Sequence, residues 1–340
     1  MTFPLIIRSI QQETSDTKSF VLDFVDEKFS YLPGQFLTLI HPVAKSIHRS
    51  YSLSSHPLLD KKLRITVKRI ANGEFSRWLC DQAVEGDVIE TIGASGFFTL
   101  PEYLPTNAPI LFLAAGSGIT PILSLLKEIL FQRQQNVVLV YSSRSVEGTI
   151  FYNELSHLQE EFPNRFTIHF LFSNSKDLFR ARLNKSLLAE ILHQHFAVTG
   201  NSLAYLCGPH DYMQMARIVL LNENFLPEKI RTEKFNDFQP IVKNIPPDRK
   251  QHTVKIEFQG KRFSLAVKFP NTILQTAKAN GIDLPYSCEA GRCGTCAATC
   301  VSGHIWMSRN EVLLDKEMAK GRVLTCTGFP VGGDAEIIVL

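Results

Sequence analysis

Cysteine placement constrains this chain more than any other feature of its sequence. Five of the seven cysteines lie between Cys288 and Cys326, while Cys80 and Cys207 stand alone. The first residues lack the basic and apolar regions of an export signal, so we expect a reducing, cytoplasmic location where structural disulfides are rare. Seven cysteines in 340 residues are also too few for a disulfide scaffold. The clustered thiols therefore indicate metal ligands or redox groups.

The spacing inside the cysteine group narrows this choice. Cys288, Cys293 and Cys296 follow a C-x4-C-x2-C pattern, and Cys326 comes after 29 further residues. Plant-type [2Fe–2S] centres use this spacing, with three thiolates on one loop and a distant fourth. The alternatives are a set of free core cysteines or structural zinc, but zinc prefers paired C-x2-C units and only one is present. We therefore predict four metal ligands and interpret Cys300 as a bystander.

Composition and turn signals divide the chain into three domains and a linker. The chain is 44% hydrophobic, enough for each domain to bury its own core. Residues 1–102 contain short β-rich runs separated by turns, which predicts a small antiparallel β-barrel. In residues 103–237 apolar strands alternate with helices, which indicates an α/β domain with a parallel sheet. A proline-containing linker covers 238–252, and residues 253–340 carry strands, a helix and the cysteine loop.

The charge balance excludes two classes of partner. There are 36 Lys and Arg residues against 33 Asp and Glu residues, a net charge of +3, which is too small an excess for a nucleic-acid or membrane surface. Glycines and Pro121 interrupt the most hydrophobic stretch, residues 109–126. A membrane span needs about 20 mostly apolar residues without such breaks, so we expect no membrane insertion.

The cysteine loop carries a family resemblance. The segment Cys288-Glu-Ala-Gly-Arg-Cys-Gly-Thr-Cys-Ala, with Leu324-Thr-Cys-Thr downstream, resembles the cluster loop of plant-type ferredoxins. This resemblance covers residues 253–340 and implies an α+β fold of the β-grasp type. These residues hold 10 Lys or Arg and 8 Asp or Glu, whereas plant ferredoxins are usually strongly acidic. Docking to an acceptor is therefore expected to depend only weakly on salt.

The first domain contains the segments Arg49-Ser-Tyr-Ser, Val67-Lys-Arg and Gly73-Glu-Phe-Ser. They are similar to the flavin-binding motifs of the ferredoxin–NADP reductase family. The resemblance implies that Arg49 holds the flavin pyrophosphate, Tyr51 lies against the isoalloxazine ring and Ser52 approaches the flavin N5. Gly73 and Ser76 would open a short helix towards the phosphate, which favours FAD over FMN. The implied flavin-binding residues are Arg49, Ser50, Tyr51, Ser52, Val67, Lys68, Gly73, Phe75 and Ser76.

The second domain carries the nucleotide signals. A Gly-x-Gly-x-x-Pro turn at 116–121 follows an apolar strand and precedes a helix. This position suits the binding of a pyrophosphate at the helix N-terminus. This domain also contains a Cys-Gly-Pro motif at 207–209 and a Glu-x-Phe motif at 233–235. In the same reductase family, the cysteine of the first motif lies beside the nicotinamide and the second motif lies near the flavin. In this family, basic and hydroxyl residues after the second and third strands bind the 2′-phosphate that distinguishes NADPH from NADH, and Arg180 is a further candidate for this role. These residues favour NADPH as the donor, with NADH as the alternative. The implied residues are Gly116, Gly118, Thr120, Pro121, Ser143, Arg144, Ser173, Arg182, Cys207, Gly208, Pro209, Glu233 and Phe235.

These signals together predict an electron-transfer enzyme. A nicotinamide delivers two electrons as hydride, a [2Fe–2S] cluster accepts one at a time, and a flavin can connect them. The implied catalytic residues are Tyr51, Ser52, Cys207 and Glu233. The domain order resembles the reductase components of multicomponent oxygenases, such as the reductase components of phenylacetyl-CoA epoxidases. The expected acceptor is therefore an oxygenase or hydroxylase component. A hybrid-cluster protein or a desaturase as acceptor, or a non-catalytic iron–sulfur carrier, are the alternatives.

Overall fold

The computed structural model describes residues 2–26, 28–106, 108–196, 200–235 and 244–339. The chain forms two compact units. One comprises Met1–Ile47, Tyr51–Ala94 and Phe98–Asp237, and the other comprises His48–Ser50, Ser95–Phe97 and Phe238–Leu340. Part of the expected linker, residues 238–243 with Pro240, lies outside the described residues, so the expected domain boundaries stay predictions.

The N-terminal strands form a six-stranded sheet in the order β4-β3-β6-β1-β2-β5. Strand β1 pairs antiparallel with β2 and β6, and β2 pairs antiparallel with β5. An antiparallel bridge between Leu53 and Ile65 joins the two outer strands, so the sheet closes on itself. Helix α1 buries Phe75 and Leu79 in the barrel core. The element bounds are β1 Phe3–Thr14, β2 Thr17–Phe24, β3 Phe36–Ile40, β4 His48–Ser52, β5 Leu63–Lys68, α1 Glu74–Asp81 and β6 Val88–Ser95.

This sheet confirms the predicted antiparallel barrel, with one strand that the sequence pattern did not reveal. Strand β1 is 12 residues long, but its second half alternates poorly because it is mostly polar and exposed. Its pairing with β2 in a hairpin, from Leu5 opposite Phe24 to Thr14 opposite Thr17, holds this half in place. Pairing between distant residues thus overrides a weak local pattern.

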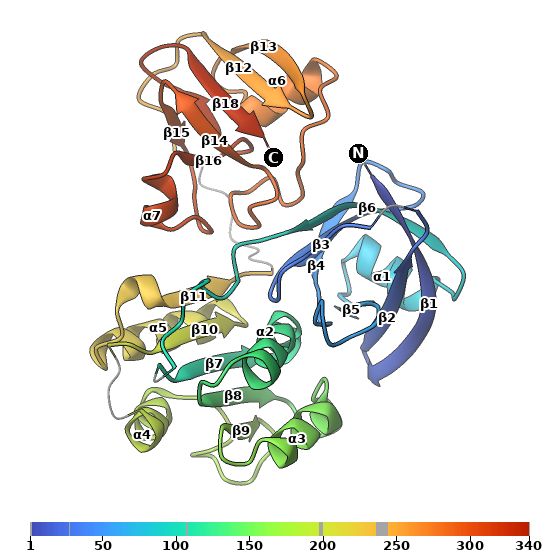
Figure 1. The fold of residues 1–340 in the computed structure, drawn as a ribbon, viewed down its shortest axis with the longest axis vertical. Coiled ribbons are helices and arrows are strands. Elements are labelled where there is room, and N and C mark those ends of the chain that lie inside the picture. The colour runs from blue at the N-terminus through green and yellow to red at the C-terminus, as the bar shows by residue number, and fades with distance from the viewer. Residues whose placement is uncertain (1, 27, 107, 197–199, 236–243, 340) are drawn as a thin grey trace. The chain divides into compact units, whose positions relative to one another are not determined.

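A five-stranded parallel sheet in the order β11-β10-β7-β8-β9 forms the second half of the first unit (Figure 1). Helices α2 and α3 cover one face, and α4 and α5 cover the other. This arrangement confirms the predicted α/β domain. The bounds are β7 Ile110–Ala115, η1 Gly116–Gly118, α2 Ile119–Gln132, β8 Val137–Ser143, α3 Tyr152–Glu161, β9 Phe166–Phe172, α4 Lys185–His195, β10 Leu203–Cys207, α5 His210–Asn222, η2 Pro227–Lys229 and β11 Ile230–Glu233.

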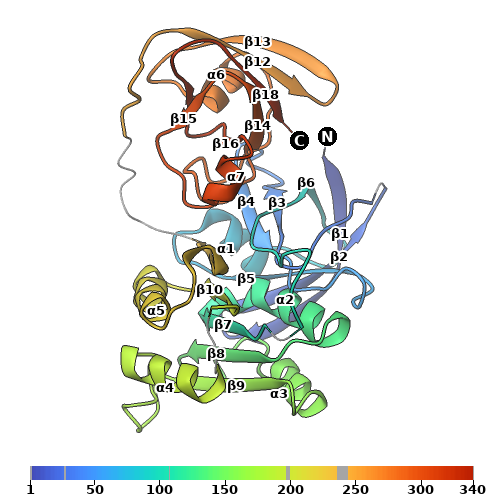
Figure 2. The same ribbon diagram turned by 60° about the vertical axis from the view of Figure 1, so that its left-hand side comes forward.

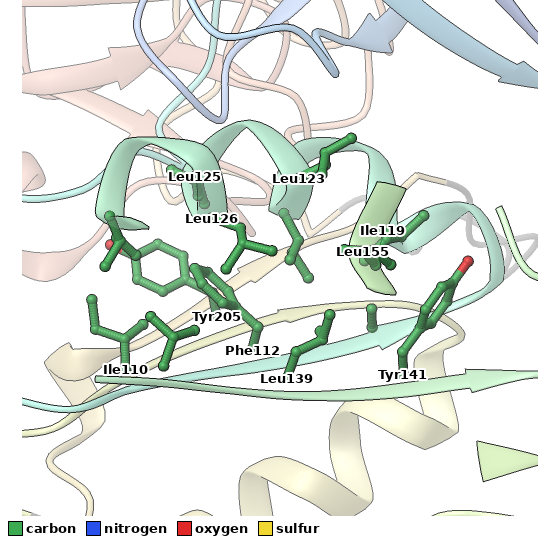
Figure 3. Packing of buried hydrophobic residues seen from close by; sticks show 14 of the residues in the cluster. Ile110, Phe112, Ile119, Leu123, Leu125, Leu126, Leu139, Tyr141, Leu155 and Tyr205 are labelled. Carbon is green, nitrogen blue, oxygen red and sulfur yellow. The ribbon is translucent and has the colours of Figure 1, made fainter. Parts of the chain in front are cut away.

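Helix α2 is packed tightly onto this sheet. Figure 3 shows its leucines above Phe112, Leu139 and Tyr205 of the central strands. Leu123 and Leu126 are fully buried, which agrees with the continuous apolar pattern of the segment. Burying a leucine side chain contributes about 1.5–3 kcal/mol, so this packing fixes the start of α2, where the Gly-rich turn lies.

Ion pairs join the barrel to the parallel-sheet half within the first unit. Arg64 on β5 makes two hydrogen bonds to Glu154 on α3, at 3.0 and 3.1 Å. Lys127 on α2 contacts Glu154 at 2.9 Å and Asp60 of the barrel at 3.0 Å. The pKa of Glu154 is lowered despite its burial, because Arg64 and Lys127 stabilise the charged form. The two halves are therefore held by charged groups as well as by apolar packing.

The C-terminal unit holds a five-stranded mixed sheet in the order β13-β12-β18-β14-β16 and a two-stranded sheet of β15 and β17 (Figure 2). Helix α6 begins with a capping box between Thr272 and Gln275 and packs into the apolar core of this unit. The fold matches the predicted α+β domain. The bounds are β12 His252–Phe258, β13 Lys261–Val267, α6 Ile273–Ala279, β14 Ala297–Ser302, β15 Ile305–Met307, α7 Asp315–Met318, β16 Arg322–Leu324, β17 Gly328–Pro330 and β18 Ala335–Val339.

Candidate redox sites

The carboxyl edge of the parallel sheet brings the predicted nucleotide motifs together. Cys207, the last residue of β10, lies in register with Ala114 on β7 and with Glu233 on β11. The turn after β7 packs directly on the end of β10, since a Cβ added to Gly118 would lie 2.0 Å from the carbonyl oxygen of Cys207. Only glycine fits this approach, so the Gly-rich turn and the Cys-Gly-Pro motif form one surface.

Hydrogen bonds hold the Gly-rich turn in shape. The Tyr141 hydroxyl donates to the carbonyl oxygen of Gly116 at 3.1 Å, and the Thr120 hydroxyl donates to that of Ser117 at 3.0 Å. Gly116 has a φ of +55°, and apart from the adjoining backbone no described atom lies within 4 Å of the position that its Cβ would take. Thr120 and Pro121 are buried at the start of α2. Hydrogen bonds therefore hold the backbone of the turn, and the space beside Gly116 is open, as phosphate binding requires.

Tyr212 adjoins this surface and was not among the residues predicted from the sequence. The Tyr212 hydroxyl donates to the carbonyl oxygen of Ala114 at 3.2 Å, and its ring lies 3.2 Å from the position of a Cβ on Gly208. Pro209 precedes α5 and ends the Cys-Gly-Pro motif. Tyr212 lies in the first turn of that helix, and an aromatic residue shortly after the motif is a weak signal by itself.

Ser52 and Glu233 connect the barrel to this edge. The Ser52 hydroxyl donates to Oε2 of Glu233 at 3.5 Å, although 181 residues separate the two. Desolvation raises the pKa of Glu233 to about 8, while the Ser52 hydrogen bond opposes the rise. The Cys207 thiol is buried, and this burial, together with the nearby Glu233, raises its pKa well above the ordinary value. Two of the predicted catalytic residues, the buried Ser52 and Cys207, therefore adjoin a third, the half-buried Glu233.

The other predicted flavin residues lie on β4, β5 and α1. Arg49 is exposed and donates to the carbonyl oxygen of His48 at 2.8 Å, with Ser50 half-buried beside it. The Tyr51 ring meets the Phe75 ring edge-on, with centroids 5.8 Å apart. Val67 and Phe75 are core residues, and Lys68 pairs with Asp16 at 3.4 Å. Gly73 caps α1, and the Ser76 hydroxyl donates to the carbonyl oxygen of Gly73 at 3.1 Å.

The residues expected near a 2′-phosphate lie on adjacent loops after β8 and β9. The backbone N–H of Ser173 donates to the carbonyl oxygen of Ser143 at 3.0 Å, and that of Asn174 donates to Arg144 at 3.1 Å. Arg144 and Arg182 are exposed, while Arg180 pairs with Glu190 at 3.2 Å. Phe235 is 44% exposed after β11. The structure thus places Ser143, Arg144 and Ser173 together.

The four predicted metal ligands gather in the C-terminal unit as two pairs of sulfurs. Cys288 and Cys293 lie close enough to shift each other's pKa, and so do Cys296 and Cys326. In the part of the chain that the structure describes, no three His, Cys, Asp or Glu side chains are arranged for a single metal ion. Two pairs of thiolates suit two irons, each with two protein sulfurs. The donor set therefore fits a [2Fe–2S] cluster.

Backbone N–H groups surround these sulfurs, as the glycines of the loop lead one to expect. The Cys293 thiol and the N–H groups of Ala290, Arg292 and Cys293 lower the pKa of Cys288 to about 5. The Cys326 thiol lowers the pKa of Cys296 in the same way, although burial opposes it. Gly291 and Gly294 have φ values of +72° and +79°, which let the loop wrap around the sulfurs. The backbone N–H groups around the Cys288 sulfur thus favour its thiolate form.

Comparison with protein families assigns each of these regions. Residues 4–100 match the model of an oxidoreductase FAD-binding domain, and residues 112–218 match that of an oxidoreductase NAD-binding domain. Residues 256–331 match the model of a 2Fe-2S iron-sulfur cluster binding domain. These matches confirm the expected FAD, pyridine nucleotide and [2Fe–2S] cofactors. No helix among the described residues has the length and apolar character needed to cross a bilayer.

Relatives match this chain over nearly its whole length. The 3-ketosteroid-9-alpha-monooxygenase, ferredoxin reductase component, of Rhodococcus rhodochrous is 35% identical over 96% of this chain and 94% of its own length. A component of the 1,2-phenylacetyl-CoA epoxidase of Escherichia coli is 27% identical over 98% of this chain and 96% of its own. The structure of phthalate dioxygenase reductase aligns with a TM-score of 0.63 at 25% identity, over 99% of this chain and 98% of that one.

Proposed function

Because this chain belongs to the family of ferredoxin reductase components of oxygenases, we propose that its electron acceptor is an oxygenase or hydroxylase component. The protein is an NAD(P)H-dependent flavoprotein iron–sulfur oxidoreductase. When bound, the flavin accepts electrons in pairs and the cluster transfers them singly. The identity of 35% with an oxygenase reductase along nearly the full chain is the observation that carries the proposal.

Ser52, Cys207 and Glu233 are the proposed hydride-transfer residues, with Tyr51 as the ring that lies against the flavin. Support comes from the hydrogen bond between Ser52 and Glu233 and from the register that sets Cys207 opposite Glu233. A Glu233 with a pKa of about 8 is mostly protonated at neutral pH. Its role is to keep negative charge away from the position where hydride arrives and to hold the Ser52 hydroxyl in place.

NADPH is the proposed electron donor. Support comes from Arg144 and Arg182, which are exposed on the loops after β8 and β9, and from the backbone contacts that bring Ser143 and Ser173 together. A planar guanidinium suits a phosphate because it offers two parallel N–H donors. Rates of flavin reduction with NADPH and NADH test the assignment. A strong preference for NADH would overturn it, and Arg182→Gln should weaken NADPH binding while leaving NADH binding unchanged.

The domain limits and the cellular location complete the proposal. We assign residues 1–102 to flavin binding, 103–237 to nucleotide binding, 238–252 to a linker and 253–340 to cluster binding. The family matches lie inside these limits. A cytoplasmic location is proposed because the four cluster thiols must stay reduced, and the reducing cytoplasm preserves them.

Reconstitution with candidate acceptors tests the acceptor class. The holoprotein is mixed with NADPH and an oxygenase component, with its substrate present or absent, and hydroxylated product is quantified. The proposal predicts product formation that depends on both proteins and is lost with the Cys326→Ser variant. Efficient electron transfer to a desaturase or a hybrid-cluster protein, with none to any oxygenase, would contradict it. A retained NADPH-dependent reduction of the flavin separates a wrong acceptor from an inactive reductase.

A further inference from the structure

Three charged side chains lie against the cysteine loop and belong to none of the four ligands. Arg309 donates to the Glu311 carboxylate through its guanidinium, and Nε of Arg292 lies 3.9 Å from Oε1 of the same carboxylate. The side chains of Arg292, Arg309 and Glu311 are only 11%, 19% and 17% exposed. We name these three residues the charge triad. It holds two cations and one anion mostly out of bulk water.

The backbone fixes the charge triad to the cluster loop. The N–H of Glu311 donates to the carbonyl oxygen of Gly291 at 2.9 Å. The Thr327 hydroxyl donates to the carbonyl oxygen of Arg309 at 2.8 Å. A Cβ on Gly291 would lie 2.6 Å from that same carbonyl oxygen, so the two segments are in close contact. None of these contacts uses a charged side chain, so the charges can be changed while the scaffold stays.

Arg292 is also part of the ligand loop itself. It lies between Cys288 and Cys293, and its backbone N–H is one of the donors to the Cys288 sulfur. A second ion pair, between Lys278 of α6 and Glu289 of this loop at 2.7 Å, is neutral overall and more exposed. The charge triad therefore carries a net positive charge beside the cysteine loop that is largely shielded from solvent.

We propose that the charge triad sets the reduction potential of the cluster, with Arg292 raising it and Glu311 lowering it. Reduction adds one negative charge to a cluster that already carries negative charge, so a nearby cation favours the reduced form and an anion opposes it. The effect is larger for side chains shielded from water than for exposed ones. The triad acts through charge and not by ligation, so these are positioning residues. The inference rests on the cluster and not on the identity of the acceptor.

A redox titration of the holoprotein tests this inference. The midpoint potential of the cluster is read from its reduced-state electron paramagnetic resonance signal, and visible absorption verifies that the cluster is bound. We expect Arg292→Met to lower the equilibrium constant for cluster reduction by about tenfold, which for one electron equals about 59 mV. Glu311→Gln should shift the potential in the opposite direction. Arg292→Lys, which keeps the charge, should retain most of the wild-type value.

Arg262 provides a matched control. It also pairs with a glutamate, Glu257, but its side chain is 81% exposed on β13. Arg262→Met should leave the potential unchanged, since solvent screens an exposed charge. Shifts of the same sign for Arg292→Met and Glu311→Gln, or no shift for either, would overturn the inference and make the triad a purely structural ion pair. If Arg292→Met binds no cluster, the Arg292→Lys and Glu311→Gln variants still decide the matter.

Discussion

Glu233→Gln is the substitution that most sharply tests the hydride-transfer site. Desolvation raises the pKa of Glu233 to about 8, so the carboxyl is neutral below that pH and charged above it. At one pH unit below the pKa about ten molecules are protonated for each ionised one, and at one unit above the ratio is reversed. If hydride transfer needs the neutral form, its rate falls roughly tenfold between about pH 7 and about pH 9.

Stopped-flow measurement of flavin reduction by NADPH without oxygen, at pH values from about 6 to about 9.5, follows this step directly. The wild-type rate should decline with an inflection near the pKa of about 8. Glutamine is uncharged at every pH and has almost the same shape, so Glu233→Gln should show a flat profile over this range. Substitution should also leave the affinity for NADPH almost unchanged, because Glu233 acts on the transferred charge and not on the nucleotide phosphates.

Glu154→Gln is the control for a buried carboxylate. Arg64 and Lys127 keep the pKa of Glu154 below its ordinary value despite burial, so this group does not titrate in the tested range. The Glu154→Gln variant should therefore keep the wild-type inflection. An inflection near pH 8 that persists in Glu233→Gln, or a wild-type rate that does not change with pH, would show that the protonation state of Glu233 does not control hydride transfer.

Three further substitutions test the other sites. Cys326→Ser removes one sulfur of a pair; flavin reduction by NADPH should persist while the reduced-cluster resonance signal disappears. Gly118→Ala places a Cβ 2.0 Å from the Cys207 carbonyl oxygen and should raise the KM for NADPH, whereas Gly148→Ala, with no atom nearer than 3.5 Å, should not. Leu123→Ala removes a fully buried side chain of α2; it should destabilise the nucleotide domain by about 2–5 kcal/mol in denaturant unfolding.

The features that could be predicted from the sequence are those that local patterns determine. The spacing of Cys288, Cys293 and Cys296 forms one loop, so it is visible without knowing the rest of the fold. The alternation of apolar strands and helices that indicates the parallel sheet is also visible locally, because strands such as β7 and β10 are short apolar runs. Strand β1 could not be predicted from its local pattern, because its second half depends on pairing with β2.

The properties of the site that the sequence does not predict depend on contacts between distant residues. The pKa of Glu233 follows from burial and from Ser52, which is 181 residues away in sequence. Likewise, nothing local to Arg292 indicates that Glu311 lies beside it. Resemblance to a family supplied the identity of Ser52, Cys207 and Glu233, but only the fold shows that Ser52 and Cys207 both lie beside Glu233.

The central claim is that electrons pass from the nucleotide through the flavin to the cluster. Anaerobic titration of the holoprotein with NADPH, followed by visible absorption and electron paramagnetic resonance, tests it most directly. We expect loss of the flavin absorption bands together with the appearance of a reduced [2Fe–2S] signal that Cys326→Ser abolishes. Full reduction of the flavin with no cluster signal in a protein that contains the cluster would contradict it.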